Sequence, residues 1–161
     1  MKKFNEIADF GKELASLENM DNALELIGSE AKRLVNAERC SIFIVDNEEH
    51  MLWTKLSDGI GRIVIGLNSG IVGDTYLKQE AQIVNNPYED SRFLAHIDKK
   101  SGFKTINMLT VPIFDSKREV MGVIQLLNKS RFDFDEKDLD TLTFFANYVS
   151  GSLELVLMQH S

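Results

Sequence analysis

Apolar residues recur every three or four positions near both ends of the chain, which is the spacing of amphipathic helices. The pattern runs over residues 4–17, restarts over 23–35, and covers 135–161 at the other end. Asp133 or Asp135 is placed to cap the last helix. The sequence therefore predicts N-terminal helices within residues 1–36 and one long C-terminal helix over 135–161.

Between these helices the pattern changes to that of strands. β-Branched and apolar residues fill 39–46, 51–59 and 62–67, and a short extended piece follows at 81–86. The stretch "SGFKTINMLTVPIFDSKREVMGVIQLLNK", residues 101–129, is predicted as two strands joined by a charged turn. Because consecutive strands are linked by short turns, we expect an α+β fold around a central antiparallel sheet of five to six strands.

Several of these strands are apolar at nearly every position, which is typical of strands that are covered on both faces. Pro112 cannot donate to a neighbouring strand, so it predicts a β-bulge or an N–H position that faces away from its neighbour. Thr105 and Gln125 are polar residues within this apolar stretch. They require hydrogen-bond partners, which a ligand or ordered water could supply.

Residues 70–105 interrupt the strand pattern, and we call them the lid. They predict a short helix from Ile71 to about Lys78, capped by Asn68 or Ser69, and one helical turn around 92–98. A lid of this kind, packed over a sheet, would enclose a concave ligand site.

Composition narrows the class of protein. The 161 residues suffice for one domain, and 18 Lys and Arg against 25 Asp and Glu give a net charge of −7, which disfavours nucleic-acid binding. The sequence contains no apolar run long enough to span a membrane and no apolar signal-peptide core. With Cys40 as its one cysteine, the chain has no internal disulfide or multi-cysteine metal site. We expect a cytoplasmic protein.

The order of elements, together with residues 101–129, resembles a GAF domain, a small-molecule sensor fold related to PAS. The similarity is greatest to the GAF domains of cyclic-nucleotide phosphodiesterases, adenylyl cyclases and bacterial signalling proteins. It covers residues 1–161 as a single domain. It implies terminal helices on one face of the sheet, and the lid over a pocket on the other.

These domains carry an Asn-Lys…Phe…Asp-Glu signature after the last strand. Asn128-Lys129 and Asp135-Glu136 are similar to its two ends. The family normally leaves three residues between the Phe and the acidic pair, whereas Phe132 leaves two and Phe134 leaves none. The match at this position is therefore imperfect.

The resemblance also implies ligand-binding positions. In cyclic-nucleotide-binding relatives the phosphate lies at the N-terminus of the first lid helix, here Ile71 and Val72; an ordinary capped helix start is the alternative. Short polar residues grip the base, and Gln125 stands where relatives have an acidic residue. A turn at Asp58 and a helix or loop cap at Asp98 remain equally open. The polar positions that the resemblance implies are Ser41, Asp58, Asp98, Ser101, Thr105 and Gln125.

Two further departures bear on the ligand. Ser57 and Leu94 stand where relatives have aromatic residues, and lost stacking would remove about 1–3 kcal/mol per base. A cyclic nucleotide, another small molecule and no ligand therefore all remain open, and no cofactor is certain. A cavity filled by Trp53, Phe103 and Leu94 would favour a domain without a ligand.

Enzyme activity is not expected. Some GAF domains reduce methionine sulfoxide, but that chemistry uses two cysteines, and bilin attachment needs a thiol in the lid. Cys40 lies on an apolar strand and is predicted to be a core residue. His96 is a conceivable haem ligand, but a lone histidine is usually not a ligand.

The terminal helices carry heptad-like spacing, which is either the core face of each helix or a dimer seam. We favour a parallel homodimer in which ligand occupancy is transmitted through the terminal helices to an output domain outside this chain. The alternative is a ligand-free dimerisation or protein-interaction module. The residues with this spacing are Ile7, Phe10, Leu14 and Leu17, and Leu139, Leu142, Ala146, Val149, Leu153 and Val156.

Overall fold

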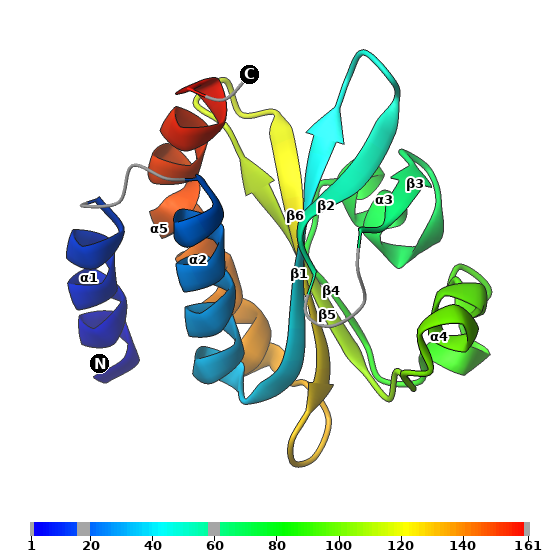
Figure 1. The fold of residues 1–161 in the computed structure, drawn as a ribbon. Coiled ribbons are helices and arrows are strands. Elements are labelled where there is room, and N and C mark those ends of the chain that lie inside the picture. Colours follow the sequence, from blue (N-terminus) through cyan, green and yellow to red (C-terminus); the bar gives the residue numbers. More distant parts are fainter. Residues whose placement is uncertain (1, 16–19, 58–61, 160–161) are drawn as a thin grey trace.

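The computed structural model describes residues 2–15, 20–57 and 62–159. A six-stranded antiparallel sheet separates a layer of long helices from the lid (Figure 1). On one side lie α1 (Lys2–Ala15), α2 (Met20–Val35) and α5 (Glu136–Gln159). The lid on the other side contains α3 (Gly70–Lys78), η1 (Pro87–Glu89) and α4 (Ala95–Ser101). The predicted α+β architecture is confirmed.

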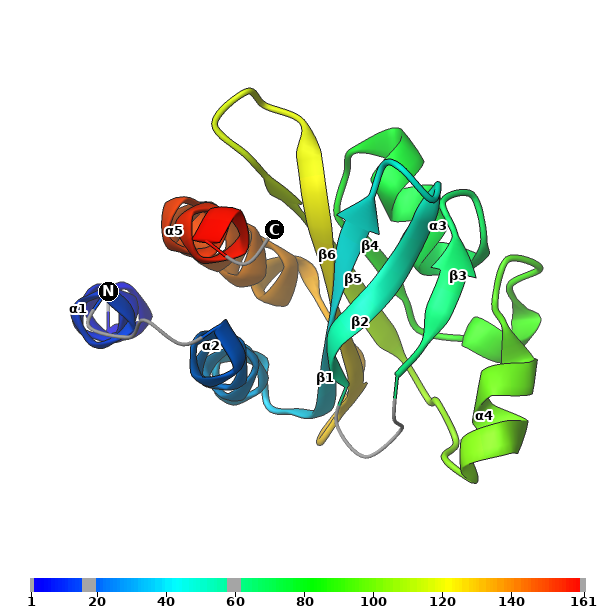
Figure 2. The same cartoon turned by 45° about the horizontal axis from the view of Figure 1, so that its top comes forward.

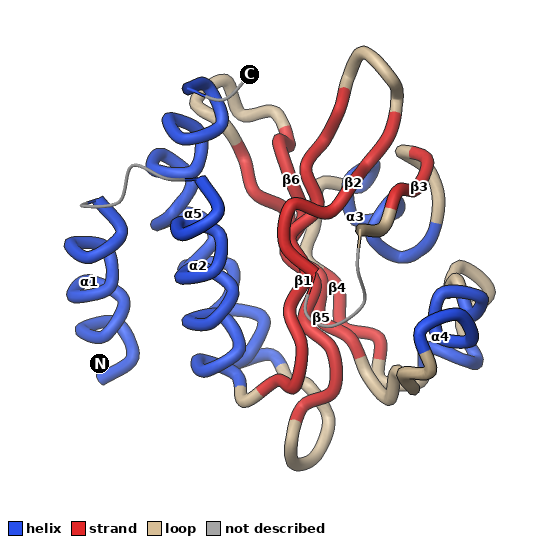
Figure 3. The backbone as a smooth tube through the Cα atoms, viewed as in Figure 1, coloured by secondary structure: helices blue, strands red, loops and turns tan. Residues whose placement is uncertain are grey.

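The strand order is β3-β2-β1-β6-β5-β4, and every neighbouring pair is antiparallel. Figure 3 shows the strands in red between the long helices and the lid. Six strands agree with the five to six expected. The predicted 101–129 hairpin is shorter than expected, because residues 102–107 form a loop after α4 instead of a strand. The bounds are β1 Ala37–Asp46, β2 Met51–Ser57, β3 Val64–Gly66, β4 Gln82–Val84, β5 Met108–Phe114 and β6 Val120–Lys129.

The central strands are buried on both faces, as their continuous apolar sequence predicts. In β1 the side chains alternate: Cys40, Ile42 and Ile44 belong to the core beneath the helices, whereas Phe43 packs on the lid side. Cys40 is fully buried, in agreement with its prediction as a core residue. The helix-side core is one continuous cluster, and the lid-side core is divided into two smaller clusters.

Pro112 occupies a position that tolerates the missing N–H. Strand β4 pairs with β5 only over Met108–Thr110, so at Pro112 the strand β5 has a paired neighbour, β6, on one side alone. A register shift between Ile113 and Phe114 follows directly. Both features expected around this proline, a bulge and an unpaired side, are present at or next to it.

Helix α5 begins with reciprocal capping. The Asp138 N–H donates to Asp135 Oδ1 at 2.9 Å, and the Asp135 N–H donates to Asp138 Oδ2 at 3.0 Å. Of the two candidate caps, Asp135 is therefore the one used.

Asp138 fits the acidic position of the family signature better than Asp135-Glu136 does. Asp138 is buried and forms an ion pair with Lys129 at the end of β6. Phe134 is also buried, and three residues separate it from Asp138, which is the spacing that the family normally shows. The pair joins the last strand to the last helix. The residue after Asp138 is Leu139, so the final Glu of the signature is replaced.

Helix α1 lies outside α2 and α5 instead of on the sheet (Figures 1 and 2). The heptad-spaced residues of α5 face inward: Leu142, Ala146 and Val149 are fully buried in the core. Ile7, Phe10 and Leu14 of α1 belong to the same core, and Leu17 lies outside the described residues. This spacing therefore marks the core face of each helix.

Within the described residues, none of the helices combines the length and the apolar character that crossing a membrane requires.

We predict that Asp138→Asn destabilises the domain by about 3 kcal/mol, because it leaves the Lys129 ammonium without its buried partner. Urea unfolding at neutral pH measures the loss. Asp140→Asn, at an exposed position of the same helix, is the matched control and should change stability little. Equal losses in the two variants would contradict a special role for the Lys129–Asp138 pair.

Candidate functional site

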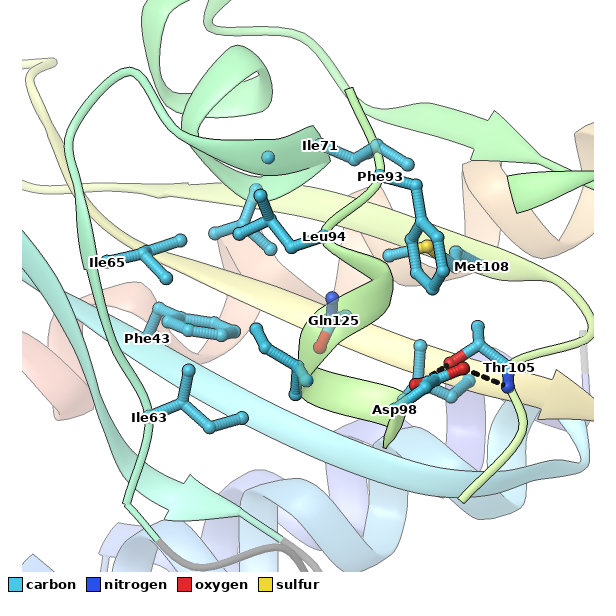
Figure 4. Close-up of a pocket in the computed structure, with 14 residues that line it drawn as sticks. Phe43, Ile63, Ile65, Ile71, Phe93, Leu94, Asp98, Thr105, Met108 and Gln125 are labelled. Carbon is cyan, nitrogen blue, oxygen red and sulfur yellow. Dashed lines mark hydrogen bonds between the residues drawn. The ribbon is translucent and has the colours of Figure 1, made fainter. Parts of the chain in front are cut away.

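A cavity lies between the centre of the sheet and the lid (Figure 4). Its free volume is about 50 Å³, and one buried water needs roughly 10–15 Å³. Small-molecule sites commonly offer about 300–1,000 Å³, so a ligand of that size has to displace part of the lid. The lining residues are Phe43, Ile63, Ile65, Gly70, Ile71, Val72, Phe93, Leu94, Ile97, Asp98, Thr105, Met108, Gln125 and Leu127.

The cavity lies where the two lid-side core clusters meet. Phe43 and Val72 belong to one cluster, whereas Ile71, Met108 and Leu127 belong to the other, and all five line the cavity. The apolar packing beneath the lid is therefore incomplete at the middle of the sheet. An apolar group inserted there would contact both clusters.

Gln125 provides the polar group of the cavity floor. It pairs with Ser41 of β1 on one side and with Thr110 of β5 on the other, which places it in the middle of the sheet. Figure 4 shows its amide among the apolar lining residues. Among the polar side chains that line the cavity, Gln125 alone makes no hydrogen bond with the described residues. Its amide can both donate to and accept from a ligand.

The other two polar lining residues bind each other. The Thr105 N–H donates to Asp98 Oδ2 at 2.7 Å, and the Thr105 hydroxyl donates to Asp98 Oδ1 at 2.8 Å. The Tyr88 hydroxyl also donates to Asp98 Oδ2, and this bond to a carboxylate raises the pKa of Tyr88. Asp98 thus links α4 to the loop before β5. This is the contact expected of a loop cap, the alternative to ligand binding at this residue. We call this group the Asp98 anchor.

A second anchor, centred on Arg92, holds the other end of the lid. Its guanidinium donates to both carboxylate oxygens of Asp90, at 2.9 and 2.6 Å, and to Asp74 of α3 at 2.6 Å. It also donates to the Gln82 side chain at 2.7 Å, so one residue links α3, β4 and the loop before α4. The Arg92 hydrogen bonds lower the pKa of Asp90 to about 2. The pKa of Asp74 is also lowered, first by the hydrogen bond from Gln82.

Between the two anchors, Phe93 and Leu94 line the roof of the cavity (Figure 4), and Ile97 of α4 lines it as well. Leu94 covers the start of α3: a Cβ added to Gly70 would lie 3.0 Å from Leu94 Cδ1. Gly70 has a φ of +70°, which also favours glycine at this position. Leu94 therefore lies against the start of α3, where an anion at this N-terminus would compete with it for space.

The first turn of α3 is not capped by a side chain. It therefore differs from the ordinary helix start, capped by Asn68 or Ser69, that was the alternative to a phosphate site. Ser69 occupies the N-cap position, but it makes no side-chain capping hydrogen bond. The Gly73 N–H donates to the Ser69 carbonyl at 3.0 Å, and the N–H groups of Ile71 and Val72 precede it. The structure places the side chains of both residues in the cavity wall.

Of the predicted binding residues, Ile71, Val72, Asp98, Thr105 and Gln125 meet at the cavity, whereas the others do not. Ser41 is buried opposite Gln125 but is not a lining residue. Ser101 is exposed; its hydroxyl accepts from the Phe103 N–H and donates to the Asp98 carbonyl. Asp58 lies outside the described residues.

The sequence prediction missed most of the apolar wall. Phe43 was identifiable from strand alternation, because it is two residues from Ser41 on the same face of β1. The lid residues Phe93 and Ile97 gave no comparable periodic pattern. Three side chains would favour a domain without a ligand if they filled the cavity: Leu94 lines it, Trp53 does not, and Phe103 packs on the cluster of Met108 and Leu127.

We predict that Arg92→Gln destabilises the domain by about 2 kcal/mol at pH 7, because charge-assisted hydrogen bonds are lost. The lowered pKa of Asp90 means that its contribution is complete above about pH 4 and is lost as the pH falls toward 2. The stability difference between wild type and variant should therefore shrink below pH 4. In carboxyl-carbon NMR titrations, the Asp90 midpoint should rise to about 4 in the variant. A midpoint that stays near 2 would contradict the assignment.

Sequence comparisons connect the chain with cyclic-nucleotide phosphodiesterases. A probable 3′,5′-cyclic phosphodiesterase of Caenorhabditis elegans is 31% identical over 149 residues, which cover 84% of this chain and 20% of that protein. A dual 3′,5′-cyclic-AMP and -GMP phosphodiesterase of Takifugu rubripes is 33% identical over 151 residues, or 81% of this chain and 16% of that protein. The chain thus spans about a fifth of the length of these relatives or less.

Solved structures share the fold over the whole chain. The GAF domain of an Acinetobacter phosphoenolpyruvate-protein phosphotransferase has a TM-score of 0.83 at 21% identity, covering 99% of this chain and 98% of that one. The GAF domain of the corresponding Coxiella burnetii protein has a TM-score of 0.85 at 15% identity, covering 98% and 96%. The model of the GAF domain family matches residues 19–153. The chain belongs to the GAF domain family, a family of regulatory domains, and the predicted resemblance is confirmed.

Proposed function

We propose that this chain is a small-molecule sensor domain whose ligand enters the cavity and contacts the Gln125 amide. The observation that carries the proposal is the Gln125 amide on the cavity floor, which makes no hydrogen bond with the described residues, whereas the other polar lining residues, Asp98 and Thr105, bond each other. The cavity also divides the lid-side core, so that a ligand would complete the packing between the two clusters. Ile71, Val72, Asp98 and Thr105 would contribute to the remaining wall.

A ligand of nucleotide size would have to displace the roof residues Phe93 and Leu94. The two anchors restrict how this can happen, because the Asp98 and Arg92 hydrogen bonds hold both ends of that segment. We propose that the roof moves between the anchors and that the altered packing reaches β1 and β6. A ligand stabilises the rearranged lid only to the extent that it binds this arrangement more tightly than the original one.

Two classes of ligand are candidates for this cavity: a cyclic nucleotide and another small molecule. The names of the phosphodiesterase relatives support the former. The aliphatic Leu94 over the α3 N-terminus supports the latter, since it covers the position that holds the phosphate in cyclic-nucleotide-binding relatives.

We further propose that the domain regulates and does not catalyse, and that its output domain lies outside this chain. The large share of the relatives' length that is not matched leaves ample room for such a domain. Cys40, the one cysteine of the sequence, is a fully buried thiol outside any disulfide, which suits the reducing cytoplasm that we propose as its setting.

The small volume of the cavity favours a second candidate function, a ligand-free interaction module. Phe93, Leu94 and Ile97 already occupy much of the space beneath the lid, and about 50 Å³ remains. In such a module the cavity would be a packing imperfection, and the terminal helices alone would carry the function.

A homodimer through the terminal helices requires a different surface from the heptad-spaced residues that were expected to form it. The outer face of α5 offers one: Phe144, Tyr148, Leu155 and Met158 are 43%, 44%, 62% and 66% exposed. With Gly151, they are spaced by four and three residues in alternation, as in a coiled-coil seam. Tyr148 lies against Gly11 of α1, so α1 flanks this surface. We propose that it pairs with the same surface of a second copy.

To test the sensor, unfolding temperatures are measured with cyclic AMP, cyclic GMP, their nucleosides and a metabolite panel. At least one compound should stabilise the protein. Gln125→Leu should weaken binding of that compound about tenfold, because one hydrogen bond is lost. It should leave the ligand-free unfolding temperature unchanged or higher. Met108→Leu, which keeps the wall apolar, should bind normally. Without any stabilising compound, the ligand-free module is the better account.

To test the dimer, sedimentation equilibrium is measured for the wild type and for Leu155→Glu. The wild type should be dimeric, and the variant should dissociate because a charge enters an apolar interface. Asn147→Glu, at another exposed position of α5, should keep the wild-type state. A monomeric wild type, or dissociation of both variants, would overturn the proposed interface.

A further inference from the structure

A basic cleft adjoins the cavity on the outside of the lid, between β3 and α4. Its lining includes Arg62, His96, Lys100 and Ser101, and its free volume is about 290 Å³. This is larger than the cavity and close to the lower end of the range for small-molecule sites, about 300–1,000 Å³. The cleft and the cavity share three wall residues: Ile63, Ile65 and Ile97 line both.

The charge of this cleft is opposite to that of the chain. The whole chain carries a formal charge of −7, yet the described residues that line the cleft include no carboxylate. His96 and Lys100 are four residues apart on α4 and therefore point from the same side of the helix. The acidic residue of the same helix, Asp98, lines the cavity instead and accepts hydrogen bonds from Thr105 and Tyr88.

The cations of the cleft are not paired with carboxylates among the described residues. The Arg62 guanidinium lies over the Trp53 ring, 4.5 Å from its centroid, which orients it without neutralising its charge. Neither Lys100 nor Arg62 forms an ion pair with the described residues. This differs from Arg92 and Lys129, whose charges are balanced by Asp90 and Asp138.

We propose that the cleft binds the anionic group, a phosphate or carboxylate, of a ligand whose apolar or ring portion enters the cavity past Ile63, Ile65 and Ile97. The proposal rests on the sensor function above and defines its ligand as an amphipathic anion. It places the charge of the ligand between β3 and α4. The alternative position, the N-terminus of α3, is covered by Leu94.

The anion site is tested directly with inorganic phosphate. Amide NMR spectra of the whole chain are recorded during titration with sodium phosphate, at an ionic strength held constant with sodium chloride. Saturable shifts should appear at residues 62–65 and 96–101. Lys100→Gln should weaken the phosphate affinity about fivefold, the upper effect of one surface ion pair. Lys99→Gln is the matched control, since Lys99 is exposed on the same helix but does not line the cleft.

Three results would overturn the proposal: no saturable shift at the cleft, shifts confined to residues 70–72, or equal effects of Lys99→Gln and Lys100→Gln. Arg62→Gln provides a second variant from the opposite wall, and it should weaken phosphate binding as Lys100→Gln does. Preserved amide spectra of the variants without phosphate show that they are folded.

A matched ligand pair separates this proposal from the sensor function itself. Stabilisation by cyclic GMP, which carries a phosphate, is compared with that by guanosine, which does not. Lys100→Gln should reduce the response to cyclic GMP and leave that to guanosine unchanged. If guanosine stabilises the protein as well as cyclic GMP does, the sensor function stands and the anion site fails. If phosphate binds at the cleft while no compound of the panel stabilises the protein, the sensor function fails and the anion site stands.

Discussion

The structure depends on one constraint: the central strands β1, β5 and β6 are apolar on both faces, so both faces must be shielded from water. The long helices α2 and α5 cover one face with large interlocking side chains. The lid covers the other face with short helices and loops. Since these short elements bury less apolar surface, polar contacts have to contribute more to holding the lid in place.

The two anchors show how this is achieved. Arg92 joins α3, β4 and the loop before α4, and Asp98 joins α4 to the loop that leads into β5. Between them, the roof residues make backbone hydrogen bonds only to neighbouring lid residues, and their side chains make apolar contacts. The lid therefore combines fixed ends with a middle that can repack, and the cavity lies beneath this middle. A segment of this kind is suited to respond to a ligand without unfolding the domain.

The same strands that form the cavity floor also contact the helices. Ile42 and Phe43 are adjacent in β1, yet Ile42 packs beneath the helices and Phe43 lines the cavity. A change in lid packing therefore acts on a strand whose opposite face is in direct contact with the helix-side core. The Lys129–Asp138 pair adds a link from the end of β6 to the start of α5. These contacts provide a physical route from the cavity to the outer face of α5.

Periodicity in the sequence was sufficient to predict the helices, most strands and the two-sided burial, because these depend on local backbone preference and on solvent exclusion along each segment. Periodicity could not predict which side chains contact one another. Asp138 instead of Asp135 pairs with Lys129, the heptad-spaced residues of α5 face the core, and Asp98 and Thr105 satisfy each other. In the same way, the basic cleft combines Arg62 with residues more than thirty positions away. Each of these depends on which distant segments meet in space and which side chains they bring within hydrogen-bonding distance, and a one-dimensional pattern does not contain that information.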